Sequence, residues 1–79
     1  MRVQVLFFGS TADITGKRRI ETEFHDGSKA SEVFDKLLAE YPGLAVHRLL
    51  LSVNQQYASG EEIICEGDEI AVFTAVSGG

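Results

Sequence analysis

One stretch of this chain, residues 30–41, has the apolar spacing of an amphipathic helix. Its apolar residues recur at i, i+3, i+4, i+7, i+8 and i+11, and they are Ala30, Val33, Phe34, Leu37, Leu38 and Tyr41. Pro42 follows and ends the helix, because proline disfavours helical backbone in the residue before it. One helix covers only one face of a sheet, so the remainder of the fold must be strands that pack against it.

The segments on either side alternate between apolar and polar residues with a period of two, which is typical of strands. The expected strands are residues 2–8, 18–25, 49–53, 62–65 and 70–76, with a turn over residues 9–16. The expected order is therefore β-β-α-β-β-β. If the first and last strands pair in parallel, the layout is a β-grasp, the ubiquitin-like α+β fold with a mixed sheet and one main helix. The predicted inner face of the sheet carries Val3, Val5, Phe7, Ile70 and Val72.

The chain is short and acidic, and these two properties argue against several classes of function. It has 79 residues, 44% of them hydrophobic, and a formal net charge of −5. That length predicts a single domain over residues 1–79 with one modest core and no deep pocket, so a self-contained enzyme is disfavoured. The negative charge argues against nucleic-acid binding, since a phosphate backbone requires a basic surface. No apolar run is long enough to span a bilayer, and we expect no membrane partner.

Groups that could support catalysis or bind a metal are sparse. His25 and His47 have no second ligand at helical or turn spacing, so surface histidines are favoured and no metal site is expected. The single Cys65 has no neighbouring cation and is interpreted as a structural thiol in a reducing, cytoplasmic compartment. An acidic stretch is either a solvated edge, which is favoured, or a docking patch for a basic partner. Its carboxylates are Glu61, Glu62, Glu66, Asp68 and Glu69.

Three aromatic residues are candidates for binding a partner. By strand alternation, Phe8 and Phe73 point to the sheet face away from the helix, with Leu6 and Ala71 beside them. Tyr57 lies in a polar turn and is expected to be exposed. A contiguous apolar patch on a small domain marks a protein interface, or it is a small second core closed by the curl of the sheet. The pattern favours neither reading over the other.

The last residues of the chain are the most informative. The Gly78-Gly79 ending follows the last strand through Val76 and Ser77, and chance gives such an ending to roughly 0.5% of chains. Glycine lacks a Cβ, so residues 75–79 are expected to form a flexible tail that can thread a narrow channel. The tail presents the Gly79 carboxylate, which becomes reactive only after activation, for example as an acyl-adenylate.

The chain resembles the small subunits of molybdopterin synthase, which are ubiquitin-like sulfur carriers. The resemblance extends over the whole chain, and its motifs are Val5-Leu6-Phe7-Phe8-Gly9, Ser52-Val53-Asn54-Gln55, Gly67-Asp68-Glu69-Ile70-Ala71 and Val76-Ser77-Gly78-Gly79. It implies that an ATP-dependent enzyme adenylates Gly79, that the carboxylate becomes a thiocarboxylate, and that its sulfur passes to cyclic pyranopterin monophosphate in the large subunit.

The resemblance also implies a heterotetramer of two small and two large subunits, with the catalytic side chains on the partners and no cofactor bound to this chain. The implied partner-binding residues are Phe8, Tyr57, Phe73, Val76, Ser77 and Gly78. Thr74-Ala75 stands where the family often has two prolines, which predicts a more mobile tail or a longer last strand. Ala12-Asp13 stands where the family often has Arg-Glu, so a loop contact by that arginine is not expected.

Three other functions fit the same features. A carrier for thiamine synthesis or tRNA thiolation shares the fold and the Gly-Gly ending, and the Thr74-Ala75 departure keeps this alternative open. A ubiquitin-type modifier uses its terminal glycine to form isopeptide bonds with lysines. A plain interaction module has an inert tail. The Val-Ser-Gly-Gly ending favours the molybdopterin carrier among these.

Overall fold

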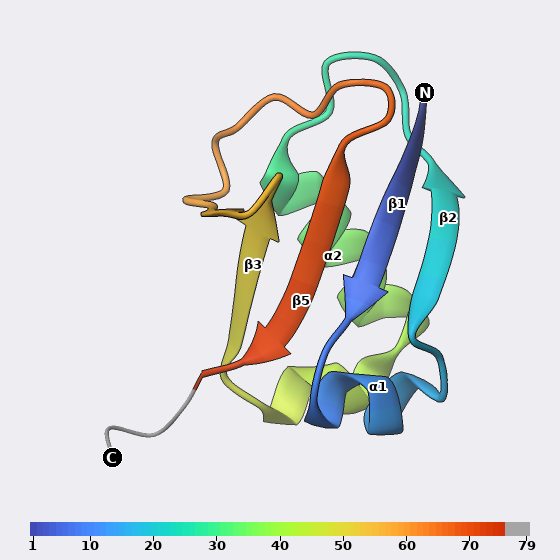
Figure 1. Ribbon diagram of the computed structural model, residues 1–79, viewed down its shortest axis with the longest axis vertical. Coiled ribbons are helices and arrows are strands. Elements are labelled where there is room, and N and C mark those ends of the chain that lie inside the picture. Colours follow the sequence, from blue (N-terminus) through green and yellow to red (C-terminus); the bar gives the residue numbers. More distant parts are fainter. Residues whose placement is uncertain (76–79) are drawn as a thin grey trace.

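The computed structural model describes residues 1–75 (Figure 1). Within this range the strands are β1 (Arg2–Phe7), β2 (Arg19–Glu23), β3 (Leu49–Val53), β4 (Gln56–Tyr57) and β5 (Glu69–Thr74). The helices in the same range are α1 (Ser10–Thr15), α2 (Ala30–Glu40) and the 3-10 helix η1 (Pro42–Val46). The predicted reactive residues Val76, Ser77, Gly78 and Gly79 lie outside it.

The strands form one mixed sheet in the order β2-β1-β5-β3-β4, so strands from opposite ends of the chain lie side by side at its centre (Figure 1). β1 and β5 run parallel, with Val5 opposite Ile70 and Phe7 opposite Val72. The β1–β2, β3–β5 and β3–β4 pairs are antiparallel. The parallel central pair confirms the predicted β-grasp fold. Because β1 and β5 run in the same direction, they also end on the same side of the sheet.

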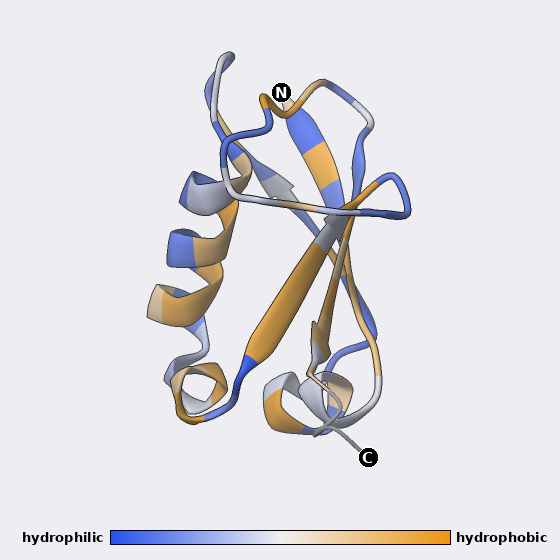
Figure 2. Cartoon of the chain, turned by 90° about the vertical axis from the view of Figure 1, so that its left-hand side faces the viewer, coloured by the Kyte–Doolittle hydropathy of each residue, from blue (hydrophilic) through white to orange (hydrophobic). Residues whose placement is uncertain are grey.

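Helix α2 covers one face of the sheet, and its apolar side turns toward the strands (Figure 2). Val33 and Leu37 of α2 are buried. They pack in one core with the predicted inner residues Val3, Val5, Phe7, Ile70 and Val72, which are all buried. The expected alternation in the first and last strands is confirmed, and the core lies between α2 and the sheet. Among residues 1–75, no helix has the length and apolar character needed to cross a bilayer.

Two expected elements are wrong. Residues 9–16 contain the short helix α1 instead of a turn, and Gly16 ends it in the left-handed conformation at φ 75°. Residues 62–65 form no strand; they make one isolated bridge, between Ile63 and Lys29. The fourth strand is β4, which lies inside the segment that we expected to be a polar turn. The order of strands and the main helix is unchanged, but α1 is an addition to the predicted layout.

Candidate functional site

The sheet face opposite α2 carries an apolar patch, which we call the docking face and define as Leu6, Phe8, Leu50, Tyr57, Ala71 and Phe73. The register places Leu6 opposite Ala71 and Leu50 opposite Phe73 on neighbouring strands. Strand alternation puts these side chains on the opposite side from the buried Val5, Ile70 and Val72. An apolar patch that the fold leaves uncovered is the usual form of a protein-binding surface.

The three predicted aromatics are all placed on or beside this face. The Tyr57 side chain is 73% exposed, and its ring centroid lies 5.9 Å from that of the partly buried Phe73, at an interplanar angle of 49°. These two rings line a shallow hollow together with Ser52 and Gln55. Phe8 follows β1 directly and is 50% exposed, and its N–H donates to the Val72 carbonyl at 3.0 Å. Their predicted role in partner binding stays a prediction.

Leu50 belongs to the docking face although sequence reasoning did not select it. It lies opposite Phe73 in the β3–β5 pair and is partly buried. The signal was present in the sequence, because Leu49, Leu51 and Val53 alternate with Leu50 and Ser52 along the expected strand. The run of three leucines concealed this alternation, since a continuous apolar run is also typical of a strand buried on both faces.

The end of β5 is held on both sides where it leaves the sheet. The Ala75 N–H donates to the Arg48 carbonyl at 2.8 Å, and the Ser10 hydroxyl donates to the Thr74 hydroxyl at 3.2 Å. The buried Thr11 of α1 is close by, and its hydroxyl contacts the carbonyl oxygens of Phe8 (2.6 Å) and Val72 (3.0 Å). Helix α1 therefore secures the strand that leads to the predicted reactive tail.

Two carboxylates of the acidic stretch accept hydrogen bonds that hold nearby turns in place. The Glu62 carboxylate accepts hydrogen bonds from the Ser59 and Gly60 N–H groups at 2.8 and 2.9 Å. Asp68 accepts from the Cys65 N–H at 2.7 Å and from the Asn54 side chain at 3.0 Å. These bonds stabilise two turns, which supports the interpretation of the stretch as a solvated edge.

Four ionisable groups near α2 and its neighbouring loop have shifted pKa values; they are His25, Lys29, Glu32 and Glu62. The hydrogen bonds from the Ser59 N–H, from its own N–H and from Gly60 lower the pKa of Glu62 to about 2. The contact with the Asp26 carbonyl and the charge of Glu32 raise the pKa of His25 above 6.5. The His25 Nε2 lies 3.3 Å from the Glu32 carboxylate on the exposed surface. Among residues 1–75, no group of three or more His, Cys, Asp or Glu side chains is arranged to hold a metal ion.

Residues 5–79 match the ThiS family, and the match includes the Gly-Gly ending. The molybdopterin synthase sulfur carrier subunit of Homo sapiens is 35% identical over 83 residues, covering 99% of this chain and 94% of the human protein. The H. volcanii small archaeal modifier protein 1 superposes with a TM-score of 0.84 at 20% identity, covering 95% of this chain and 98% of that one.

A second similar structure is a complex of subunits 1 and 2 of the molybdopterin-converting factor from Helicobacter pylori 26695. One of its chains superposes with a TM-score of 0.70 at 23% identity, and the superposition covers all of both chains. At this identity the two structural likenesses establish the fold. The likeness in sequence, which runs through the last residue, carries the information on function.

Proposed function

Because this chain belongs to the ThiS family, we propose that it is the sulfur carrier subunit of a molybdopterin synthase. The observation that carries the proposal is the extent of the family match, which runs from the middle of β1 through Gly79. A carrier requires a terminal carboxylate that can be activated and a surface that partners recognise. The sequence ending supplies the first of these, and the docking face fits the second.

The proposed chemistry takes place at Gly79. The terminal carboxylate attacks the α-phosphorus of ATP in an activating enzyme, and pyrophosphate leaves. The terminal sulfur of a persulfide on the sulfur source then displaces AMP from the acyl-adenylate and forms an acyl disulfide. A second thiol attacks the sulfur that remains on the source, which releases the thiocarboxylate and leaves a disulfide there. The thiocarboxylate enters the large subunit of the synthase and donates its sulfur to cyclic pyranopterin monophosphate. The pockets and catalytic side chains belong to the partners in this scheme, and the chain supplies the activated end.

Two partners follow from this scheme. One is the large subunit, with which the chain forms a heterotetramer of two small and two large subunits. The complex of subunits 1 and 2 from Helicobacter pylori, one chain of which has the fold of this protein, supports the pairing of the two kinds of subunit. The other is the ATP-dependent activating enzyme. Phe8, Tyr57 and Phe73 are proposed to contact a partner from the docking face, while Val76, Ser77 and Gly78 lead Gly79 into the partner's active site.

Intact-mass spectrometry tests the proposed chemistry directly. The chain purified after co-expression with its activating enzyme and sulfur source is expected to be heavier by about 16 Da, because one oxygen is replaced by sulfur. A variant that lacks Gly79 is expected to keep its fold by circular dichroism and to show no such shift. Addition of the loaded chain to the large subunit and pyranopterin monophosphate is expected to produce molybdopterin.

The same experiment separates the alternatives. Higher-mass conjugates to lysines without a thiocarboxylate would identify a ubiquitin-type modifier. A thiocarboxylate that forms normally but never yields molybdopterin with the large subunit would identify a carrier for thiamine synthesis or tRNA thiolation. An unmodified terminus under all conditions would identify an interaction module with an inert tail.

A further inference from the structure

Cations flank the docking face near the end of the sheet where β5 stops. Arg19 lies opposite Leu6 in the β1–β2 pair, and so shares its side of the sheet. The register continues for one more step, because the Phe7 N–H donates to the Arg18 carbonyl at 2.9 Å. The next residue pair is therefore Phe8 and Lys17, and both line one surface hollow with Leu6 and Arg19.

A further cation borders the same face on its other side. The bond from the Ala75 N–H to the Arg48 carbonyl continues the β3–β5 register, so Arg48 alternates with Leu49 and shares the face of Leu50. Lys17, Arg19 and Arg48 are exposed and enter none of the ion pairs found among residues 1–75. Within residues 1–75, Asp13 is the carboxylate that lines the hollow beside Lys17. We call Lys17, Arg19 and Arg48 the basic rim.

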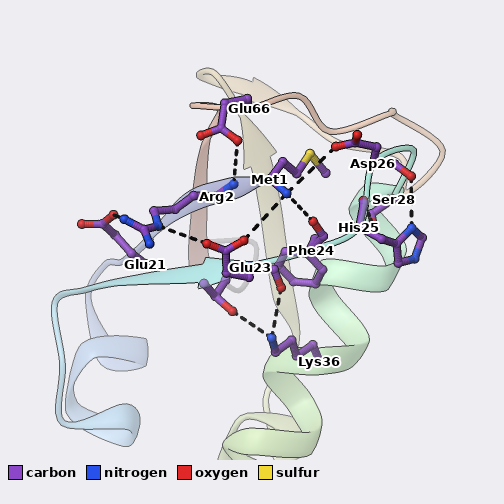
Figure 3. Close-up of polar contacts among 11 residues, drawn as sticks. Met1, Arg2, Glu21, Glu23, Phe24, His25, Asp26, Ser28, Lys36 and Glu66 are labelled. Carbon is purple, nitrogen blue, oxygen red and sulfur yellow. Dashed lines mark hydrogen bonds and ion pairs between the residues drawn. The ribbon is translucent and has the colours of Figure 1, made fainter.

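The opposite end of the same face is acidic. Glu21, Gln4 and Glu69 form one row across β2, β1 and β5. Arg2 contributes a cationic side chain to this region, and it already lies 3.3 Å from Glu23 and 3.8 Å from Glu21 (Figure 3). Arg48 therefore lies nearest the end of β5, and the apolar side chains come next, flanked on the β2 side by Lys17 and Arg19. The carboxylates of Glu21 and Glu69 lie farthest from the end of β5.

We propose that this order of charges sets the orientation in which the docking face binds its partner, and that the partner surrounds the opening of its active site with carboxylates. Such carboxylates attract the basic rim when the tail points into the opening. A reversed arrangement brings Glu21 and Glu69 against them, and the repulsion between like charges disfavours it. The inference rests on the proposed function, since it assumes that the docking face meets the large subunit.

Association kinetics with the large subunit test the proposal. The rim variant is Arg19→Gln/Arg48→Gln, and the control is Lys29→Gln/Lys36→Gln, which removes two positive charges at α2, away from the docking face. At low ionic strength the rim variant is expected to associate about tenfold more slowly than the unaltered chain. The association rate of the control is expected to stay within about twofold of that of the unaltered chain. High salt is expected to remove the difference in association rate between the rim variant and the unaltered chain.

The outcomes separate this inference from the function on which it rests. Equal association rates for the two variants, with the unaltered chain still binding, would contradict the charge order and leave the carrier function intact. Failure of the unaltered chain to bind the large subunit would contradict the proposed function and the inference with it. Thermal unfolding of both variants checks that the comparison is between folded proteins.

Discussion

At the scale of single residues, Glu62 shows how an exposed carboxylate can organise a loop. One of its oxygens accepts from the Ser59 N–H and hydroxyl, and the other accepts from the Gly60 N–H. These donors favour the ionised carboxylate and lower its pKa from 4.5 to about 2. The residue therefore acts as the local anchor of the segment that follows β4.

The lowered pKa predicts how this contribution depends on pH. The folded pKa lies below the unfolded one, so the stabilisation is present above about pH 4.5 and is lost as the pH falls through about 2. Glu62→Gln is expected to lower the free energy of unfolding near neutral pH, and the deficit is expected to shrink in acid. Chemical denaturation across that pH range measures it. Glu61→Gln is the control, because among residues 1–75 the Glu61 carboxylate has Lys29 as its one hydrogen-bond or ion-pair partner. An equal pH effect in this control would argue against the Glu62 anchor.

At the scale of elements, strong periodicity was predictable and short elements were not. Helix α2 and its C-cap Tyr41 together have six apolar residues at helical spacing, and β1 and β5 alternate cleanly. Their faces could therefore be predicted from the sequence. Helix α1 has six residues, which is too short for such a pattern, and the tertiary contacts of Thr11 with the ends of β1 and β5 stabilise it.

The segment around Ile63 and Ile64 explains the misplaced fourth strand. Its sequence is typical of a strand, but Glu62 binds the preceding loop and its carbonyl accepts from the Ala30 N–H at 2.9 Å. The Ile64 N–H donates to the Ser28 carbonyl at 2.8 Å. The segment thus pairs with the start of α2 and not with the sheet. Such long-range competition for backbone groups leaves no trace in local periodicity.

This arrangement predicts opposite outcomes for two adjacent isoleucines. Ile64 is 2% exposed and belongs to the core, so Ile64→Ala is expected to lower the free energy of unfolding by about 2–4 kcal/mol. Ile63 is 55% exposed, and Ile63→Ala is expected to change it by less than about 1 kcal/mol. Urea denaturation of both variants measures the difference. Similar losses at both positions would mean that the segment packs as a two-sided strand.

At the scale of the whole molecule, helix α2 covers one face of the sheet and leaves the docking face uncovered. Phe73 lies on that second face and is only partly buried. Phe73→Asp is therefore expected to weaken binding to the large subunit at least about tenfold while changing the thermal unfolding midpoint little. Val46→Asp is the matched control, since Val46 is 82% exposed on η1 and outside the docking face. Parallel losses of binding and of stability in Phe73→Asp would place Phe73 in a second core.

The central position of β5 has a mechanical consequence. A partner that draws the end of the chain into its active site pulls on this strand along its own axis. β5 is bonded on one side to β1 and on the other to β3, so the load falls on both ladders in shear and their hydrogen bonds resist together. An edge strand under the same pull would peel away one bond at a time. Under the proposed function, the domain therefore stays folded while a partner pulls on its C-terminal end.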